Sequence, residues 1–166
     1  AIKELHSERL TPHGVTSFLR EINTMVKLRN ERFILPFVGY TIDSPYCLIT
    51  EYVPNGTLYA YTHKAKKKAT LSDTHLNINA MCIAYGMMKM HEMSVVHRDL
   101  KTLNILLDHN YLPMICDFGT SRNVIEKSHR KMTPYTGTIT HMAPEVLFMR
   151  PHPNFNKEQN KEKNDN

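Results

Sequence analysis

The chain has 166 residues, of which 41% are apolar and 22% are charged, and this composition is typical of one soluble globular domain or of part of a larger one. It has no run of 18 or more apolar residues and no visible signal peptide, so we expect no membrane-spanning segment. The net charge is +5, but apart from a lysine-rich segment at 64–68 the basic residues are dispersed, which argues against a nucleic-acid partner. Three cysteines without metal-site spacing favour reduced thiols and a cytoplasmic location.

The first third of the chain mixes strand-like and helix-like patterns. Residues 1–5 read as the end of a strand, and residues 15–28 carry apolar side chains at helical spacing. Two segments rich in β-branched and aromatic residues, 33–42 and 46–52, are separated by a short turn and predict a hairpin of strands. The Pro-Asn-Gly sequence at 54–56 then breaks the pattern, as a linker between two lobes would.

The rest of the chain predicts one long helix, short apolar segments and a polar end. Residues 72–92 are helical in pattern, with Ser72 or Asp73 as the N-cap. We expect the apolar residues of this helix to share one face: Leu76, Met81, Ala84, Tyr85 and Met88. Residues 119–141 are hydroxyl-rich and predict a long functional loop. The residues at 154–166 are almost all polar, and we expect them to be disordered.

The sequence HRDLKTLN at residues 97–104, followed by DFG at 117–119, resembles the catalytic core of a protein kinase. The fixed identities in the first motif would occur by chance in about one chain in 10⁵ to 10⁶ of this length. The resemblance implies an α+β, two-lobed, protein-kinase-like fold. It places a small, mostly β N-lobe at 1–52, a mostly α C-lobe at 53–150, both truncated, and a polar tail at 151–166.

The resemblance also assigns roles in phosphoryl transfer, which depends on positioning and charge neutralisation. Asp99 would orient the attacking hydroxyl and accept its proton, and Lys101 would contact the γ-phosphate. Asn104 and Asp117 would bind Mg²⁺ through oxygen atoms, the ligands that this cation prefers.

Upstream, the sequence AIKEL at the start of the chain resembles the strand that carries the phosphate-binding lysine. By this resemblance Lys3 would contact the α- and β-phosphates of ATP, and Glu21 on the predicted helix would hold it in place.

The LITEYVPNGTL segment resembles the hinge that binds adenine through backbone groups. Thr50 would then be the gatekeeper at the back of the pocket, and the main chains of Glu51 and Val53 would face the purine. Ala1 and Leu106 would cover the two faces of the adenine ring. The same resemblance expects an internal apolar column made of Met25, Phe37, His97 and Phe118.

Downstream, the APE sequence at 143–145 resembles the end of an activation segment. Thr138 would contact Asp99 and Lys101, which favours serine or threonine over tyrosine as the acceptor. Hinge and loop together resemble the tyrosine-kinase-like group of serine/threonine kinases.

Arg98 implies regulation, because an arginine before the catalytic aspartate can pair with a phosphate on the activation loop. Thr133 and Thr136 are the candidate phosphorylation sites, followed by Ser128 and Tyr135.

We therefore predict a serine/threonine kinase that transfers the γ-phosphate of Mg-ATP to protein substrates in signalling. The alternatives are a pseudokinase or inactive fragment that acts as a scaffold, a small-molecule kinase, and a basic nucleic-acid-binding module. The six glycines do not form a G-x-G-x-x-G motif, which we interpret as truncation before Lys3.

Overall fold

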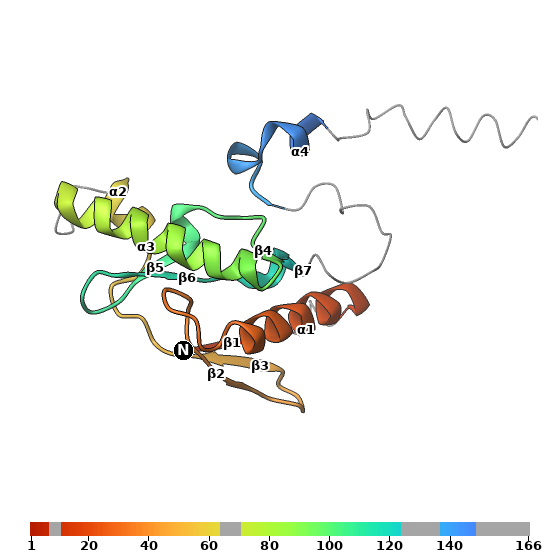
Figure 1. Ribbon diagram of the computed structural model, residues 1–166. Coiled ribbons are helices and arrows are strands. Elements are labelled where there is room, and N and C mark those ends of the chain that lie inside the picture. The colour runs from red at the N-terminus through yellow and green to blue at the C-terminus, as the bar shows by residue number, and fades with distance from the viewer. Residues whose placement is uncertain (7–10, 64–70, 124–136, 149–166) are drawn as a thin grey trace, which may run out of the picture.

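The computed structural model describes residues 1–6, 11–63, 71–123 and 137–148, which form two groups of elements (Figure 1). The strands are β1 (Ile2–Glu4), β2 (Phe37–Tyr40), β3 (Cys47–Thr50), β4 (Val95–Val96), β5 (Ile105–Leu107), β6 (Pro113–Ile115) and β7 (Arg122–Asn123). The α-helices are α1 (Pro12–Lys27), α2 (Leu58–Thr62), α3 (Asp73–Glu92) and α4 (Pro144–Phe148). Short 3₁₀ turns are η2 (Thr102–Asn104), η3 (Phe118–Thr120) and η4 (Ile139–His141). The predicted tail and the lysine-rich segment lie outside the described residues.

The first group is an antiparallel sheet with strand order β1-β3-β2, together with α1. The pairing of β2 with β3 confirms the predicted hairpin, although both strands are shorter than expected. The residues before β2 run instead toward the second group, where the Leu35 N–H donates to the Ile115 carbonyl at 2.9 Å. This pairing with β6 joins the two groups through the backbone.

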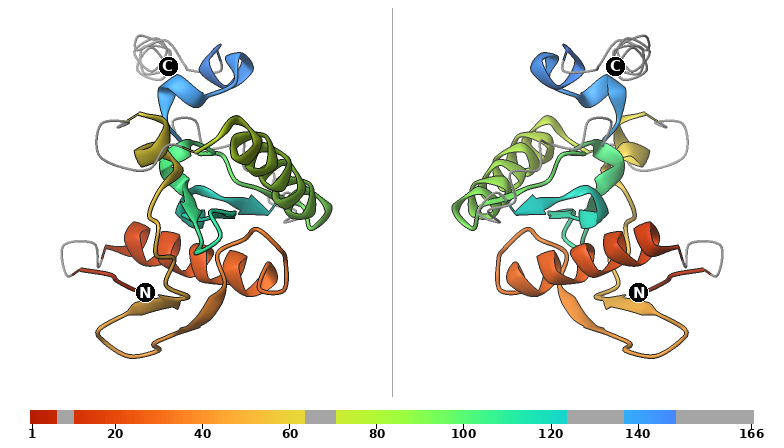
Figure 2. Two further views of the ribbon diagram at one scale, coloured as in Figure 1. Left: turned by 90° about the vertical axis from the view of Figure 1, so that its left-hand side faces the viewer. Right: turned by 90° about the vertical axis from the view of Figure 1, so that its right-hand side faces the viewer.

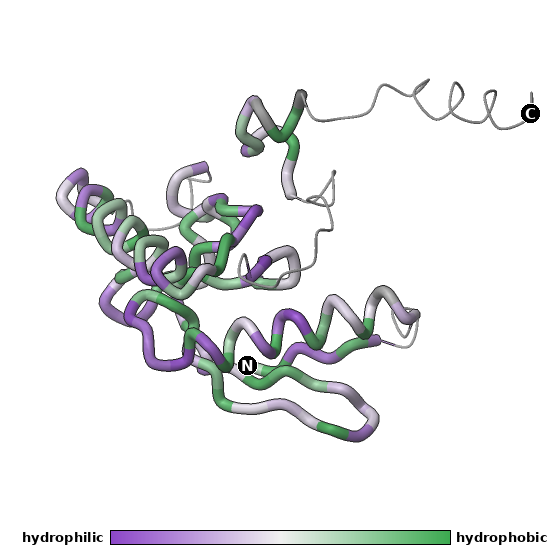
Figure 3. Tube along the Cα trace, turned by 45° about the vertical axis from the view of Figure 1, so that its right-hand side comes forward, coloured by the Kyte–Doolittle hydropathy of each residue, from purple (hydrophilic) through white to green (hydrophobic). Residues whose placement is uncertain are grey.

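Helix α1 lies between the three-stranded sheet and the segment that contains β5 to β7 (Figure 2). It begins at Pro12, three residues before the predicted start, because Thr11 caps it by accepting a hydrogen bond from the Gly14 N–H at 3.1 Å. Hydrophilic and hydrophobic residues alternate along the helix (Figure 3). Its buried apolar residues are Phe18, Ile22 and Met25, so one stripe of the helix enters the core.

Helix α3 confirms the predicted N-cap, since the Ser72 hydroxyl accepts the His75 N–H at 3.3 Å. The five residues predicted to share an apolar face are all exposed, with Met81 74% exposed, so this face is not the one that enters the core. The buried positions are Asn79, Gly86 and Met90. The helix packs closest at Gly86, where an added Cβ would lie 2.9 Å from Ile115 Cδ1. The face of α3 that packs against β6 is therefore the one that carries the small residue Gly86. The spacing of apolar residues in the sequence does not indicate this face.

The two groups share one core, which contains Phe118 and Met25. His97, Phe118 and Met25 of the expected apolar column are buried, and Phe37 packs partly buried against the same core. The rings of His97 and Phe118 are 5.5 Å apart. The α+β class is confirmed, with a sheet and one helix in the first part and most of the helices in the second. Within the described ranges, no helix has the length and apolar character needed to cross a bilayer.

Candidate active site

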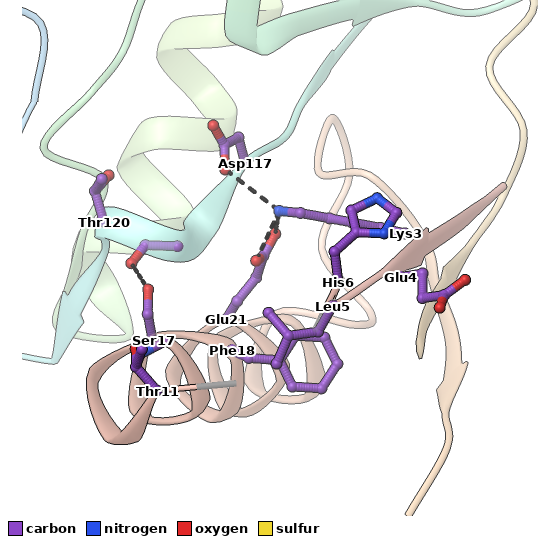
Figure 4. A pocket seen from close by; sticks show the side chains of 12 residues that line it. Lys3, Glu4, Leu5, His6, Thr11, Ser17, Phe18, Glu21, Asp117 and Thr120 are labelled. Carbon is purple, nitrogen blue, oxygen red and sulfur yellow. Dashed lines mark hydrogen bonds and ion pairs between the residues drawn. The ribbon is translucent and has the colours of Figure 1, made fainter. Parts of the chain in front are cut away.

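Lys3 and Glu21 form an ion pair between β1 and α1 (Figure 4). The Lys3 ammonium donates to both carboxylate oxygens of Glu21 at 2.8 Å, and it also lies 3.7 Å from Asp117 Oδ1. Glu21 is only 5% exposed, and a buried carboxylate is costly unless it is paired. The structure thus brings together three residues for which the sequence predicts roles in binding phosphates and metal.

A second group surrounds Asp99, which is buried in the loop between β4 and η2. The Lys101 ammonium donates to Asp99 Oδ2 at 2.7 Å and to the Thr138 hydroxyl oxygen at 2.6 Å. The Thr138 N–H and hydroxyl both donate to Asp99 Oδ1, at 2.8 and 2.6 Å. The three side chains therefore make the contacts that the sequence resemblance implied.

The ionisation of Asp99 follows from these contacts. Burial acts to raise the pKa of Asp99, but hydrogen bonds from Lys101 and from the side chain and backbone of Thr138 outweigh it, and the pKa is lowered. The carboxylate is therefore ionised at neutral pH and can accept hydrogen bonds only. This is the state required of a group that orients a hydroxyl and takes its proton.

The backbone has unusual conformations at residues that flank or belong to both groups of side chains. Arg98 and Asp117 have φ values of 67° and 63°, in the left-handed region that few residues other than glycine occupy. Gly137 has φ of 120°, and a Cβ on it would lie 2.5 Å from the Arg98 carbonyl oxygen. Only glycine fits this approach, and it brings the next residue, Thr138, against Asp99.

His97 links the loop that contains Asp99 to Cys116, the residue after β6, from within the core. Its Nδ1 accepts the Asp99 N–H at 3.3 Å, so its proton is on Nε2, which donates to the Cys116 carbonyl at 3.0 Å. Burial lowers the pKa of His97, which favours the neutral ring that this pair of bonds requires. The ring is a support for the loop and is wholly buried.

The two predicted metal ligands lie at the ends of paired strands. Asn104 directly precedes β5 and Asp117 follows β6 by two residues, and the Cys116 N–H donates to the Asn104 carbonyl at 3.0 Å. The Asn104 side-chain amide donates to the Asp99 carbonyl at 2.8 Å, so its side-chain oxygen is the atom left for a cation. No cluster of three acidic, histidine or cysteine side chains occurs in the described ranges. A two-oxygen set fits Mg²⁺, which is commonly held by one or two side chains plus substrate phosphates.

The predicted adenine-binding residues lie at the junction of the two groups. Ala1 and Thr50 pair through their backbones, with the Thr50 N–H donating to the Ala1 carbonyl at 2.9 Å. The Glu51 N–H donates to the Pro36 carbonyl at 3.0 Å. The Glu51 carbonyl accepts the Thr50 hydroxyl at 3.2 Å, and since a carbonyl oxygen has two lone pairs, one of them is left for a purine. Val53 follows, partly buried, in the segment between β3 and α2.

Leu106 lies in β5 opposite Met114 and forms an isolated bridge with Thr57. It is partly buried, on the strand that follows Asn104 directly. The contacts thus place Leu106 beside the segment that leads from the hinge to α2. They do not join it to Ala1, the other residue expected to cover the adenine ring.

A pocket of about 420 Å³ opens between β1, α1 and η3. Its lining includes Lys3, Glu21 and Asp117 (Figure 4), and none of the predicted hinge residues lines it. Gly119 also lines it, and a Cβ there would lie 3.6 Å from Glu21 Oε2. The pocket thus lies beside the residues for which the sequence predicts phosphate and metal binding. Its Ser17, whose hydroxyl donates to the Gly119 carbonyl at 3.1 Å, was not predicted from the sequence.

Two further predictions concern groups beside the site. The Arg98 guanidinium donates to the Thr120 carbonyl, and its pKa is lowered by burial and by the nearby charges of Arg20 and Arg122. Cys116 is partly buried, and burial raises the pKa of its thiol to about 12. The three cysteines are free thiols. The candidate phosphorylation sites Ser128, Thr133, Tyr135 and Thr136 lie outside the described residues.

Comparisons with known proteins identify the family of this chain. The family model described as the protein kinase domain matches residues 1–164. Serine/threonine-protein kinase STY46 of Arabidopsis thaliana is 36% identical over 156 residues, which cover 92% of this chain and 26% of the relative. Serine/threonine-protein kinase CTR1, also of Arabidopsis thaliana, is 35% identical over 154 residues, covering 91% and 18%. RGS domain-containing serine/threonine-protein kinase A of Dictyostelium discoideum is 36% identical over 154 residues, covering 93% and 13%.

The chain spans about a quarter or less of the length of these relatives. The family model, in contrast, covers nearly the whole chain. The two groups of side chains described above lie within the matched residues. The chain therefore belongs to the protein kinase domain family.

Proposed function

We propose that this chain is the catalytic part of a serine/threonine protein kinase that transfers the γ-phosphate of Mg-ATP to protein hydroxyls. The observation that carries the proposal is the group formed by Asp99, Lys101 and Thr138. A carboxylate, an ammonium and a hydroxyl lie within 2.6 to 2.7 Å of one another. This arrangement leaves one charged acceptor and one charged donor at the point where a substrate hydroxyl meets a phosphate.

In this proposal each group has a separate task. Asp99 orients the incoming hydroxyl and takes its proton as the new oxygen–phosphorus bond forms. Lys101 offsets the negative charge on the transferred phosphoryl group. Lys3, held by Glu21, contacts the α- and β-phosphates. Mg²⁺ neutralises phosphate charge when it is bound, and Asn104 and Asp117 are the residues that would hold it.

The nucleotide base is assigned to the hinge. Thr50 is the proposed gatekeeper, and the Glu51 carbonyl and the Val53 backbone face the purine edge. Ala1 and Leu106 are the proposed apolar contacts of the ring. The support for this assignment is the resemblance of the LITEYVPNGTL segment to a kinase hinge, and the bond of the Glu51 N–H to Pro36 leaves its carbonyl as the group for the purine.

Serine and threonine are the proposed acceptors, and the tyrosine-kinase-like group is the proposed branch. The support is the contact of Lys101 with Thr138 and the names of the relatives, most of which are serine/threonine kinases. One relative, dual specificity protein kinase shkB of Dictyostelium discoideum, is 30% identical, so tyrosine must be among the acceptors tested. We also propose a cytoplasmic signalling role, with control by phosphorylation at Thr133 or Thr136 and pairing of the added phosphate with Arg98.

The test is phosphotransfer by the full-length protein, with radiolabelled ATP, Mg²⁺ and a mixture of acceptor proteins. Asp117→Asn removes the carboxylate charge at the metal site, and Asp73→Asn makes the same change at the exposed start of α3. We expect incorporation by the unchanged protein and by Asp73→Asn, and none above background by Asp117→Asn. Equal incorporation by all three proteins, or none by any, would favour the scaffold alternative.

A further inference from the structure

Helix α1 presents a polar stripe to the turn that carries Asp117. Ser17, Glu21 and Thr24 are spaced four and three residues apart, which places them on one face of the helix. Ser17 donates to the Gly119 carbonyl and Glu21 binds Lys3 (Figure 4). Thr24 is the third member of the stripe, and the phosphate-binding role described above does not use it.

Thr24 reaches Ser121, which is 97 positions later in the chain. Their hydroxyl oxygens are 2.9 Å apart, and Ser121 also donates to the Phe118 carbonyl at 2.7 Å. A serine hydroxyl has one proton, so Thr24 must be the donor to Ser121. The result is a directed relay from α1 through Ser121 to the backbone of Phe118.

The relay lies in the core, where Ser121 is 0% exposed and Thr24 is 8% exposed. A buried hydroxyl that loses its partner cannot turn to bulk water, so the relay resists separation of α1 from η3. Phe118 is itself wholly buried and directly follows Asp117, whose backbone is in the left-handed region. Glu21 lies one helical turn before Thr24. The relay therefore ties the helix that holds Glu21 to the turn that holds Asp117.

We propose that Thr24 and Ser121 are positioning residues for phosphoryl transfer: they hold α1 against η3 so that Glu21, Lys3 and Asp117 stay together. This inference rests on the proposed kinase function. Neither hydroxyl touches substrate, because both are buried on the core side of η3. Their effect is on the nucleotide and its phosphates, and it leaves binding of the protein acceptor unchanged.

Four single variants of the full-length protein separate positioning from ordinary packing. Thr24→Val keeps the shape of the side chain and removes the hydroxyl, whereas Thr24→Ser keeps the hydroxyl. Thr16→Val is the matched control, because the Thr16 hydroxyl bonds within its own helix, to the Pro12 carbonyl at 2.7 Å. Ser121→Ala removes the other end of the relay.

We expect Thr24→Val to lower kcat/KM for ATP about fivefold to twentyfold, in the range of couplings carried by packed polar networks, with KM for the acceptor peptide unchanged. Thr24→Ser restores most of the loss, and Thr16→Val matches the unchanged protein. Because the two hydroxyls act as one relay, Thr24→Val combined with Ser121→Ala loses no more than the worse single variant. Unchanged kinetics in Thr24→Val, no rescue by Thr24→Ser, or additive losses in the double variant would overturn the proposal.

Hydrogen exchange of the nucleotide-free protein keeps this test separate from that of the proposed function. Thr24→Val should speed exchange both in α1 and in the segment 118–123, and Thr16→Val should not. If the unchanged protein transfers no phosphate, the proposed kinase function fails and with it the positioning role in catalysis. Hydrogen exchange then tests separately whether the relay holds α1 against the segment 118–123. If Thr24→Val changes exchange in neither segment, the structural role of the relay is overturned as well.

Discussion

The two halves of the candidate active site, the group around Asp99 and the group around Lys3, are built differently. Around Asp99, four donors bind one buried carboxylate: the Lys101 ammonium, the Thr138 hydroxyl and backbone N–H, and the Asn104 side-chain amide. Around Lys3, one ion pair joins two separate elements, and the side chains of Lys3 and Asp117 are 52% and 49% exposed. The first half is fixed by short-range contacts in a strained loop. The second depends on where α1 lies, so it is the half that a conformational change can open or close.

The largest expected effect is at Asp99. Asp99→Asn removes the charge that Lys101 and Thr138 hold, and it removes the proton acceptor. We expect kcat to fall about 10³-fold, within the usual range for loss of a general base, with KM for ATP little changed. Steady-state kinetics of the full-length protein measures this, with Asp73→Asn as the control. A loss below tenfold would mean that the buried carboxylate is only structural.

The next largest effect is at Glu21. Glu21→Gln keeps the shape but removes the charge that holds Lys3, and we expect kcat/KM for ATP to fall roughly 10- to 100-fold. The matched control is Glu92→Gln, because Lys89 and Glu92 form a surface pair of the same 2.8 Å length, and exposed pairs contribute little. Similar kinetics in the two variants would show that the Lys3–Glu21 ion pair matters no more for catalysis than the surface pair of Lys89 and Glu92.

A smaller effect is expected from Gly137→Ala. The new Cβ would meet the Arg98 carbonyl at 2.5 Å with φ at 120°, and strain of this kind costs about 1–3 kcal/mol. Because Thr138 would shift away from Asp99, we expect kcat/KM for the acceptor to fall about tenfold. Gly39→Ala is the control, since an added Cβ there meets no atom within 4 Å. If Gly137→Ala retains full activity, the close approach of residue 137 to the Arg98 carbonyl is not needed for catalysis.

The smallest expected effect concerns Cys116, beside Asp117. With a pKa of about 12, only about one thiol in 10⁴ is ionised at pH 8, and the thiolate is the reactive form. We expect slow alkylation by iodoacetamide that rises about tenfold per pH unit while the protein stays folded. Mass spectrometry of the folded and denatured protein measures the two rates. Rapid alkylation of the folded protein at pH 7 would show that the thiol is accessible and activated.

The sequence predicted the residues that belong to recognisable motifs. It missed the residues whose role depends on contacts in the folded core. Lys3, Glu21 and Asp99 stand in motifs whose order and spacing few other functions share. Thr24 and Ser121 are common residue types 97 positions apart, and no local pattern pairs them. The only available signal was the spacing of Ser17, Glu21 and Thr24 along one helix face.

Helix α3 shows the same limit for the fold. Its ends followed from capping and periodicity, but its buried face did not, because Met81 and several other large apolar residues are exposed whereas Asn79, Gly86 and Met90 are buried. The contact with β6 is made at Gly86, where the backbones come close. Hydrophobicity indicates that a helix is amphipathic, and the shape of its partner decides which side is covered.

The identity of the acceptor tests the central claim most directly. The full-length protein would be incubated with Mg-ATP and three peptide libraries that differ only in a central serine, threonine or tyrosine, with Asp99→Asn as the blank. The contact of Lys101 with Thr138 and Asp99 predicts phosphate on serine and threonine, and none on tyrosine above the blank. Phosphate on tyrosine above the blank, or on none of the three, would contradict the account.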